Sequence, residues 1–132
     1  MKTENLSDDI VTLDMLNVIG DAFNQNNINA VMNCFDKQAI FDHAAGQDIH
    51  GTRYEGHEAL RKVFETLFNN VQSVHWETID QRINGNKAFC EYRRKAILKN
   101  GEVQDFHSID ILTFKKGLII HKNTYYKNIV VP

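Results

Sequence analysis

The hydrophobic period of the chain changes near Val71, and this change limits the folds open to it. Upstream of Val71, apolar residues recur at helical spacing, whereas downstream they alternate as in strands. Short breaks rich in Asn and Gly interrupt the downstream part, and such breaks are typical of hairpin turns. We therefore predict strands at about 72–83, 87–98, 103–115 and 118–128, broken at Asn84-Gly85-Asn86, Asn100-Gly101 and Lys116-Gly117. Short connections require antiparallel neighbours, so these strands should form a meander.

The first half is predicted to be mostly helical. Three apolar stripes at helical spacing predict three helices. The first stripe is Leu13, Leu16, Ile19, Ala22 and Phe23, and the second is Ile28, Val31, Met32 and Phe35. The third stripe predicts a helix at about 57–68. Ser7, Asp8 and Asp9 are candidate caps for the first helix. A short strand is expected at Ala39–Asp42, and residues 43–56, with three glycines, are expected to be a loop. The order predicts an α+β domain with N-terminal helices packed on one face of a curved antiparallel sheet, enclosing a pocket.

Composition narrows the classes of function. The 132 residues suit a single domain over 1–132, and the net charge of −2 speaks against nucleic-acid binding. Cys34 and Cys90 stand alone, so we expect neither a disulfide framework nor a zinc site. There is no signal-peptide pattern and no apolar run of membrane-spanning length. We therefore expect a soluble cytoplasmic protein.

Asp110 is the main candidate for a catalytic acid–base residue. On an alternating strand it shares a face with apolar Phe106, Leu112 and Phe114 and with Ser108. A carboxyl group among such neighbours is solvated, paired, or kept neutral, and acid–base enzymes exploit the last case. The structural alternative is a turn cap or an ion pair with Arg94.

Further candidates fall on the predicted inner faces of neighbouring strands. Trp76, Tyr92 and Tyr126 should line the pocket or the core, with Arg94 beside Tyr92 and Lys122 beside Tyr126. An inward cation would pair with Asp110 or bind an anionic ligand. If Lys122 faces Asp110, that carboxylate stays ionised.

The stretch from Asp42 to His57 is rich in acids and imidazoles. Its members are Asp42, His43, Asp48, His50 and His57. Their spacing fits no strong ligand motif, so we predict no metal and favour a solvated loop. His43 and His57 remain candidates for the pocket mouth, whereas His107 should point to the opposite face from Asp110.

Two groups of short motifs carry a family resemblance. The first runs from Asn27-Ile28-Asn29-Ala30-Val31-Met32 through Ala39-Ile40-Phe41-Asp42 and is followed by Gly51-Thr52-Arg53-Tyr54-Glu55-Gly56-His57-Glu58-Ala59-Leu60. The second is Ile109-Asp110-Ile111-Leu112-Thr113-Phe114 with Gly117-Leu118-Ile119 and Tyr125-Tyr126. In this order they resemble the nuclear-transport-factor-2-like superfamily, in particular its SnoaL-like polyketide cyclase and ketosteroid isomerase group. The resemblance implies a cystatin-like cone.

The resemblance also implies roles for two acids. Asp42 matches the isomerase's general base, and Asp110 matches its neutral oxyanion donor. Asp110 also matches the acid that serves as acid–base group in SnoaL-like cyclases. Ile19 stands where the isomerase has a second donor, a tyrosine, which argues against steroid isomerisation as such.

The resulting expectation is a small enzyme that needs no cofactor and performs acid–base chemistry on a hydrophobic carbonyl compound. Cyclisation, isomerisation and dehydration would all use it. Two alternatives are a non-catalytic domain that binds a small ligand and a structural partner that works through its sheet face. A homodimer is expected through the outer sheet face, where we place His75, His107, Ile109, Ile111 and Ile119.

Overall fold

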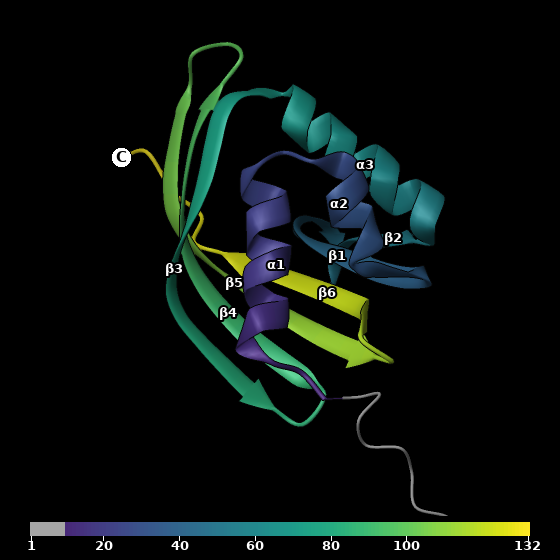
Figure 1. Cartoon of the computed structure of the whole chain (residues 1–132). Coiled ribbons are helices and arrows are strands. Elements are labelled where there is room, and N and C mark those ends of the chain that lie inside the picture. The colour runs from purple at the N-terminus through teal and green to yellow at the C-terminus, as the bar shows by residue number, and fades with distance from the viewer. Residues whose placement is uncertain (1–9) are drawn as a thin grey trace, which may run out of the picture.

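The computed structural model describes residues 10–132 (Figure 1). The elements in chain order are α1 (Leu13–Asn24), α2 (Ile28–Asn33), β1 (Phe35–Asp48), β2 (Gly51–Glu55), α3 (His57–Asn69), β3 (Val71–Asn84), β4 (Lys87–Leu98), β5 (Val103–Lys115) and β6 (Leu118–Tyr126). The Thr12 hydroxyl accepts from the Met15 N–H at 3.2 Å and caps α1. The predicted caps Ser7, Asp8 and Asp9 lie outside the described residues. Within residues 10–132 no helix is long and apolar enough to cross a membrane.

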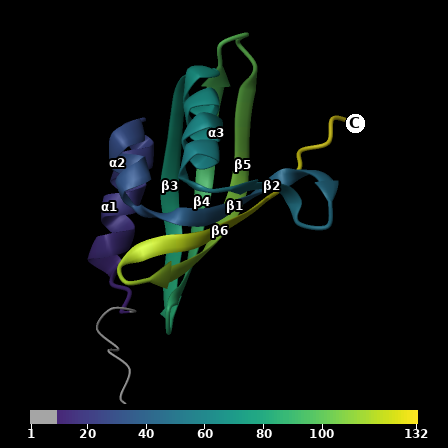
Figure 2. The same ribbon diagram turned by 90° about the vertical axis from the view of Figure 1, so that its right-hand side faces the viewer.

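The strands form one curved sheet in the order β2-β1-β6-β5-β4-β3. The strands β3 to β6 pair as the predicted antiparallel meander. Their turns use left-handed backbone at Gly85 (φ 61°), and at Lys116 and Gly117 (φ 51° and 79°), as tight hairpins require. β1 adds to β6 in parallel, so the sheet is mixed, a pairing between distant segments that local pattern does not reveal. Figures 1 and 2 show the helices on the concave side of this sheet.

The predicted loop over residues 43–56 is wrong. β1 continues to Asp48, and β2 pairs back onto it as an edge hairpin. Most side chains from residue 45 to residue 55 are exposed, so this hairpin carries no alternation of apolar and polar residues. The hairpin also needs glycine, because Gly51 has φ 82° and lies against the carbonyl of His43.

The core lies between the helices and the concave face. α1 buries Leu16, Ile19 and Ala22, and α3 buries Leu60 and Phe64. Leu13, predicted for the same stripe, is 54% exposed because it is the first residue of the helix. The Phe64 ring lies 5.3 Å from that of Phe23 and 5.0 Å from that of Phe41, which ties α1, α3 and β1 together.

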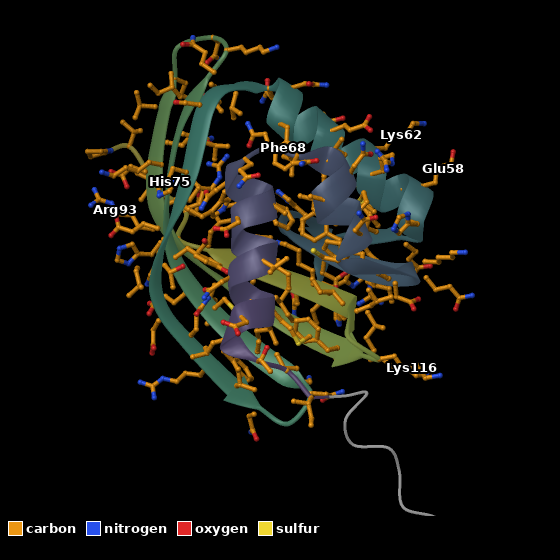
Figure 3. The ribbon with its side chains drawn as sticks, viewed as in Figure 1. Glu58, Lys62, Phe68, His75, Arg93 and Lys116 are labelled. Atoms are coloured by element: carbon orange, nitrogen blue, oxygen red, sulfur yellow. The ribbon has the colours of Figure 1, made fainter. Side chains whose placement is uncertain are left out.

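A bulge in β6 decides which of its residues face inward. Thr113 pairs with His121 but Phe114 pairs with Ile119, so Ile120 is an extra residue. Ile119 therefore faces the core and is 0% exposed, and its predicted place on the outer face is wrong. His75 is exposed and lies on the convex side of the sheet as predicted, as does Arg93 (Figure 3).

Candidate functional site

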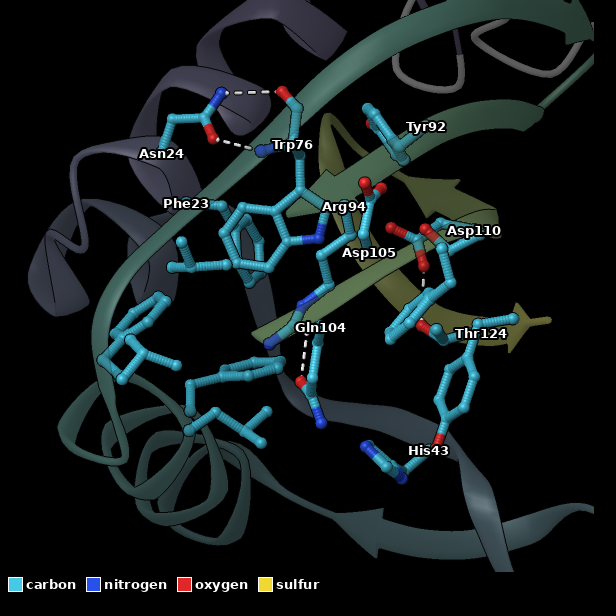
Figure 4. Close-up of a pocket in the computed structure, with 18 of the residues that line it drawn as sticks. Phe23, Asn24, His43, Trp76, Tyr92, Arg94, Gln104, Asp105, Asp110 and Thr124 are labelled. Carbon is cyan, nitrogen blue, oxygen red and sulfur yellow. Dashed lines mark hydrogen bonds between the residues drawn. The ribbon is translucent and has the colours of Figure 1, made fainter. Parts of the chain in front are cut away.

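The helices and the concave face enclose a cavity of about 680 Å³. Its walls combine aromatic side chains with aliphatic and polar ones, drawn from α1, α3, the sheet and the segment after β6. All of the predicted ligand-binding residues line it, together with Asp110; they are Trp76, Tyr92, Arg94, Lys122 and Tyr126. Asn24, at the end of α1, holds the wall in place by bonding the backbone N–H and C=O of Trp76 at 2.9 and 3.1 Å (Figure 4).

Asp110 is paired through one of its two oxygens. Its Oδ1 accepts from the Lys122 ammonium at 3.0 Å and from the Thr124 hydroxyl at 2.6 Å, and Lys122 also donates to that hydroxyl at 2.7 Å. Asp110 is therefore an ion-paired carboxylate, which conflicts with the neutral donor that the isomerase resemblance implied.

The second oxygen of Asp110, Oδ2, has no hydrogen-bond partner within residues 10–132. In that part of the chain, no fully buried side-chain oxygen or nitrogen lacks a partner, so Oδ2 must be accessible. Because Asp110 lines the cavity, this oxygen is available to a bound molecule.

Lys122 is almost enclosed by aromatic rings. It is 8% exposed, and its ammonium lies 4.8 Å from the Phe41 ring centre and 5.6 Å from that of Phe23. The faces of these rings are electron-rich and favour a cation. The ammonium has three N–H groups, of which Asp110 and Thr124 use two, so one remains for a ligand.

Asp42 does not share the cavity with Asp110, and the predicted convergence of the two carboxylates is wrong. Its neighbours Phe41 and His43 line the cavity, so strand alternation turns Asp42 to the other face of β1. There it is 2% exposed and accepts from Arg53 Nε at 2.8 Å, from Arg53 Nη2 at 2.9 Å and from His121 Nε2 at 2.8 Å.

The contacts of Asp42 join three strands. Arg53 lies on β2, Asp42 on β1 and His121 on β6. Hydrogen bonding and charge from the Arg53 guanidinium, supported by His121, hold the pKa of Asp42 below its usual value against the opposing effect of burial. We therefore interpret Asp42 as a structural clamp. The sequence already indicated this orientation, because strand alternation places Asp42 on the opposite face from its apolar neighbour Phe41.

His43 lies on the cavity wall, as expected for one of the two imidazoles proposed for its mouth. Its Nδ1 accepts from the Ala45 N–H at 3.2 Å, so the neutral ring carries its hydrogen on Nε2. Burial lowers the pKa of His43, and the nearby cations Lys122 and Arg94 act in the same direction. His43 is thus a neutral donor near these two cations. The other imidazole, His57, bonds the Met32 carbonyl at 2.9 Å and does not line the cavity.

Arg94 does not pair with Asp110, which was the structural alternative for both residues. It donates instead to Gln104 Oε1 at 2.8 Å. Its guanidinium lies 5.8 Å from the Trp76 ring centre and 5.4 Å from that of Phe106. Sequence reasoning missed Gln104 and Thr124, although Thr124 shares a strand face with Lys122 and Tyr126.

The acid- and imidazole-rich stretch from Asp42 to His57 does not gather its side chains around one point. Asp42 is engaged by Arg53 and His121, and His57 by a backbone carbonyl. Across residues 10–132, no group of three or more His, Cys, Asp or Glu side chains is placed to hold a metal ion.

Comparison with known families gives one match. The sequence model of a family described as "SnoaL-like domain" matches residues 18–122. No curated protein sequence matches the chain.

Solved structures resemble the chain over most of its length. A hypothetical protein of Catenulispora acidiphila with a ketosteroid isomerase-like fold, in complex with trimethylamine, is 18% identical with a TM-score of 0.76, covering 89% of this chain and 88% of the other. A putative polyketide cyclase of Sinorhizobium meliloti is 17% identical, with a TM-score of 0.70 and coverages of 88% and 95%. TerC, co-crystallised with polyporic acid, is 10% identical, with a TM-score of 0.74 and coverages of 87% and 90%. At these identities the likeness establishes the fold alone.

Proposed function

The chain belongs to the SnoaL-like domain family, in the nuclear-transport-factor-2-like superfamily, and from this premise we propose that it is an acid–base enzyme acting on a hydrophobic carbonyl compound. One observation carries the proposal. Asp110 is held through Oδ1 by Lys122 and Thr124, while Oδ2 faces a cavity lined in part by aromatic side chains. An ionised carboxylate with one oxygen anchored and the other free is a positioned general base. The proposed chemistry needs no cofactor.

The proposed reaction begins with proton abstraction next to the carbonyl group. Asp110 Oδ2 takes the proton, the C–H electron pair forms the enolate, and the carbonyl oxygen gains negative charge. The remaining N–H of Lys122 and the Nε2–H of His43 are the available donors to this oxygen. The protonated Asp110 then returns the proton, either to another carbon in an isomerisation or to the new alkoxide after intramolecular aldol attack.

Deuterium exchange tests the proposal before the natural substrate is known. 2-Tetralone is a hydrophobic ketone with acidic α-hydrogens, and proton NMR in D₂O follows the loss of their signal. We expect the protein to accelerate this exchange above the buffer rate, and to do so for other hydrophobic ketones that fit the cavity. If such ketones bind without any acceleration, the acid–base proposal is wrong.

A non-catalytic ligand-binding domain is the second candidate, and one observation favours it. Lys122 already compensates the charge of Asp110, so the pair is electrostatically complete without a substrate proton. Trimethylamine and polyporic acid in neighbouring structures support a small-molecule occupant under either candidate. Binding without exchange in the tetralone experiment would favour this second candidate.

We also propose a homodimer in the cytoplasm. The outer face of β5 carries Ile109 and Ile111, which are partly exposed, and His107, which is exposed. Cys34 and Cys90 are free thiols, as suits a reducing compartment. Light scattering coupled to size-exclusion chromatography should give twice the 15.2 kDa chain mass, and replacing Ile109 with lysine should shift it to the monomer. A wild-type monomer would contradict the dimer.

A further inference from the structure

Arg94 is the one cation of the cavity interior that no carboxylate compensates within residues 10–132. Among the charged lining side chains, Glu102, Asp105 and Lys127 are exposed at the surface. The enclosed ones are Asp110, Lys122 and Arg94, of which the first two form an ion pair at 3.0 Å. Arg94 therefore leaves the cavity with an excess positive charge.

The guanidinium of Arg94 is held in place, and some of its N–H donors remain unused. Of its three nitrogens, only Nη1 makes a hydrogen bond in the described chain, to Gln104 Oε1 at 2.8 Å. Because no fully buried polar side-chain atom of residues 10–132 lacks a partner, the unused Nε and Nη2 are accessible. Trp76 and Phe106 flank the group and fix its plane.

The surroundings of Arg94 make its charged guanidinium unfavourable in free energy when no anion is bound to it. Removal from water penalises the charged form, and the same burial lowers the pKa of Arg94. A hydrogen bond to a neutral amide such as Gln104 returns less energy than one to an anion. A ligand carboxylate would supply the missing charge and accept two parallel N–H bonds from the free fork.

We propose that Arg94 is a carboxylate anchor, and that the ligand of this cavity is therefore a hydrophobic polycyclic acid. The inference rests on the proposed function for the reacting end of the molecule, where Asp110 and Lys122 lie. Figure 4 shows Arg94 extending toward Gln104, apart from the Asp110–Thr124 pair. The carboxylate and the reacting carbonyl thus occupy two different ends of the cavity.

Strand register sets the separation of these ends. Arg94 lies opposite Phe106 on β5, and Asp110 follows four residues later on the same strand. At a rise of about 3.3 Å per residue, the backbones at the two ends are about 13 Å apart. A flat molecule of two or more rings suits a site of this length, and the aromatic side chains in the cavity wall favour flat rings.

A matched ligand pair tests the anchor without depending on turnover. 2-Naphthoate and 2-naphthamide have nearly the same shape, but only the first is an anion. Isothermal titration calorimetry should show that the wild-type protein binds 2-naphthoate about tenfold or more tightly than 2-naphthamide, as expected for a charge-assisted bidentate contact. Arg94→Gln should abolish this preference, and Arg94→Lys should retain part of it.

Arg93→Gln is the matched control. Arg93 precedes Arg94 on β4, lies on the convex face where it pairs with Asp105 at 2.8 Å, and changes the net charge by the same amount (Figure 3). This variant should keep the full preference. Equal wild-type affinity for the two ligands, or a preference that survives in folded Arg94→Gln, would overturn the anchor.

The anchor and the proposed reaction fail separately. If the naphthoate preference depends on Arg94 but no ketone exchanges deuterium, the anchor stands and the binding-domain candidate replaces the enzyme. If exchange is catalysed but the preference is absent, the enzyme stands and the anchor is wrong. Thermal unfolding of Arg94→Gln and Arg94→Lys verifies that both variants are folded before their affinities are compared.

Discussion

Replacing Asp110 with asparagine should slow the catalysed deuterium exchange by about 10²- to 10⁴-fold, the usual contribution of a positioned general base. Asparagine has nearly the same shape and keeps an oxygen for Lys122 and Thr124, but its amide cannot take a proton at neutral pH. Affinity for 2-naphthoate should change little, because the carboxylate contact lies at Arg94. The exchange rate by NMR and the affinity by calorimetry separate these effects.

The Asp110 experiment needs two controls. Asp80→Asn removes a carboxylate from an exposed pair with Arg82 and should leave the exchange rate unchanged. Asp110→Asn leaves the ammonium of Lys122 unpaired in a site where it is 8% exposed, so stability should fall. The double variant Asp110→Asn/Lys122→Met should recover stability without recovering exchange. Wild-type exchange in folded Asp110→Asn would show that another group is the base.

Replacing Asp42 with asparagine should do the reverse: it should lower stability and spare the exchange rate. The carboxylate accepts three hydrogen bonds from Arg53 and His121 while it is 2% exposed. Breaking a buried ion pair costs about 3–5 kcal/mol, but Arg53 and His121 are 36% and 34% exposed and can regain water. We therefore expect the free energy of unfolding to fall by about 2–3 kcal/mol in urea titrations at pH 7.

The pH dependence identifies the charge on Asp42 as the cause. The pKa of Asp42 is lowered in the folded protein, so its contribution is complete above the unfolded value of about 3.9. The contribution is lost as the pH falls through the lowered folded pKa. The stability difference between wild type and Asp42→Asn should thus persist at about pH 5 and shrink below about pH 4. A stable Asp42→Asn variant without exchange activity would restore Asp42 as the base.

Much of this architecture could be predicted because it depends on short-range patterns. The period-2 alternation after Val71 and the glycine turns predicted the meander and the inward face of Asp110, and both are confirmed. The helical stripes likewise predicted α1, α2 and α3. The edge hairpin after His43 was not predicted, because most of its side chains from residue 45 onward are exposed and the run shows no sustained alternation of apolar and polar residues.

Apart from the bulge in β6 that turns Ile119 inward, the sequence by itself determined the direction of most sheet side chains that line the cavity, since that direction follows from strand alternation and turn chemistry, which are local. Only the tertiary structure decided what those residues are paired with. The parallel contact of β1 with β6, between segments about 80 positions apart, brings His121 to Asp42 at 2.8 Å. The cross-strand register of β5 and β6 places Lys122 in contact with Asp110, and no carboxylate in the described chain pairs with Arg94. Charge state depends on neighbours in space, and long-range pairing sets those neighbours.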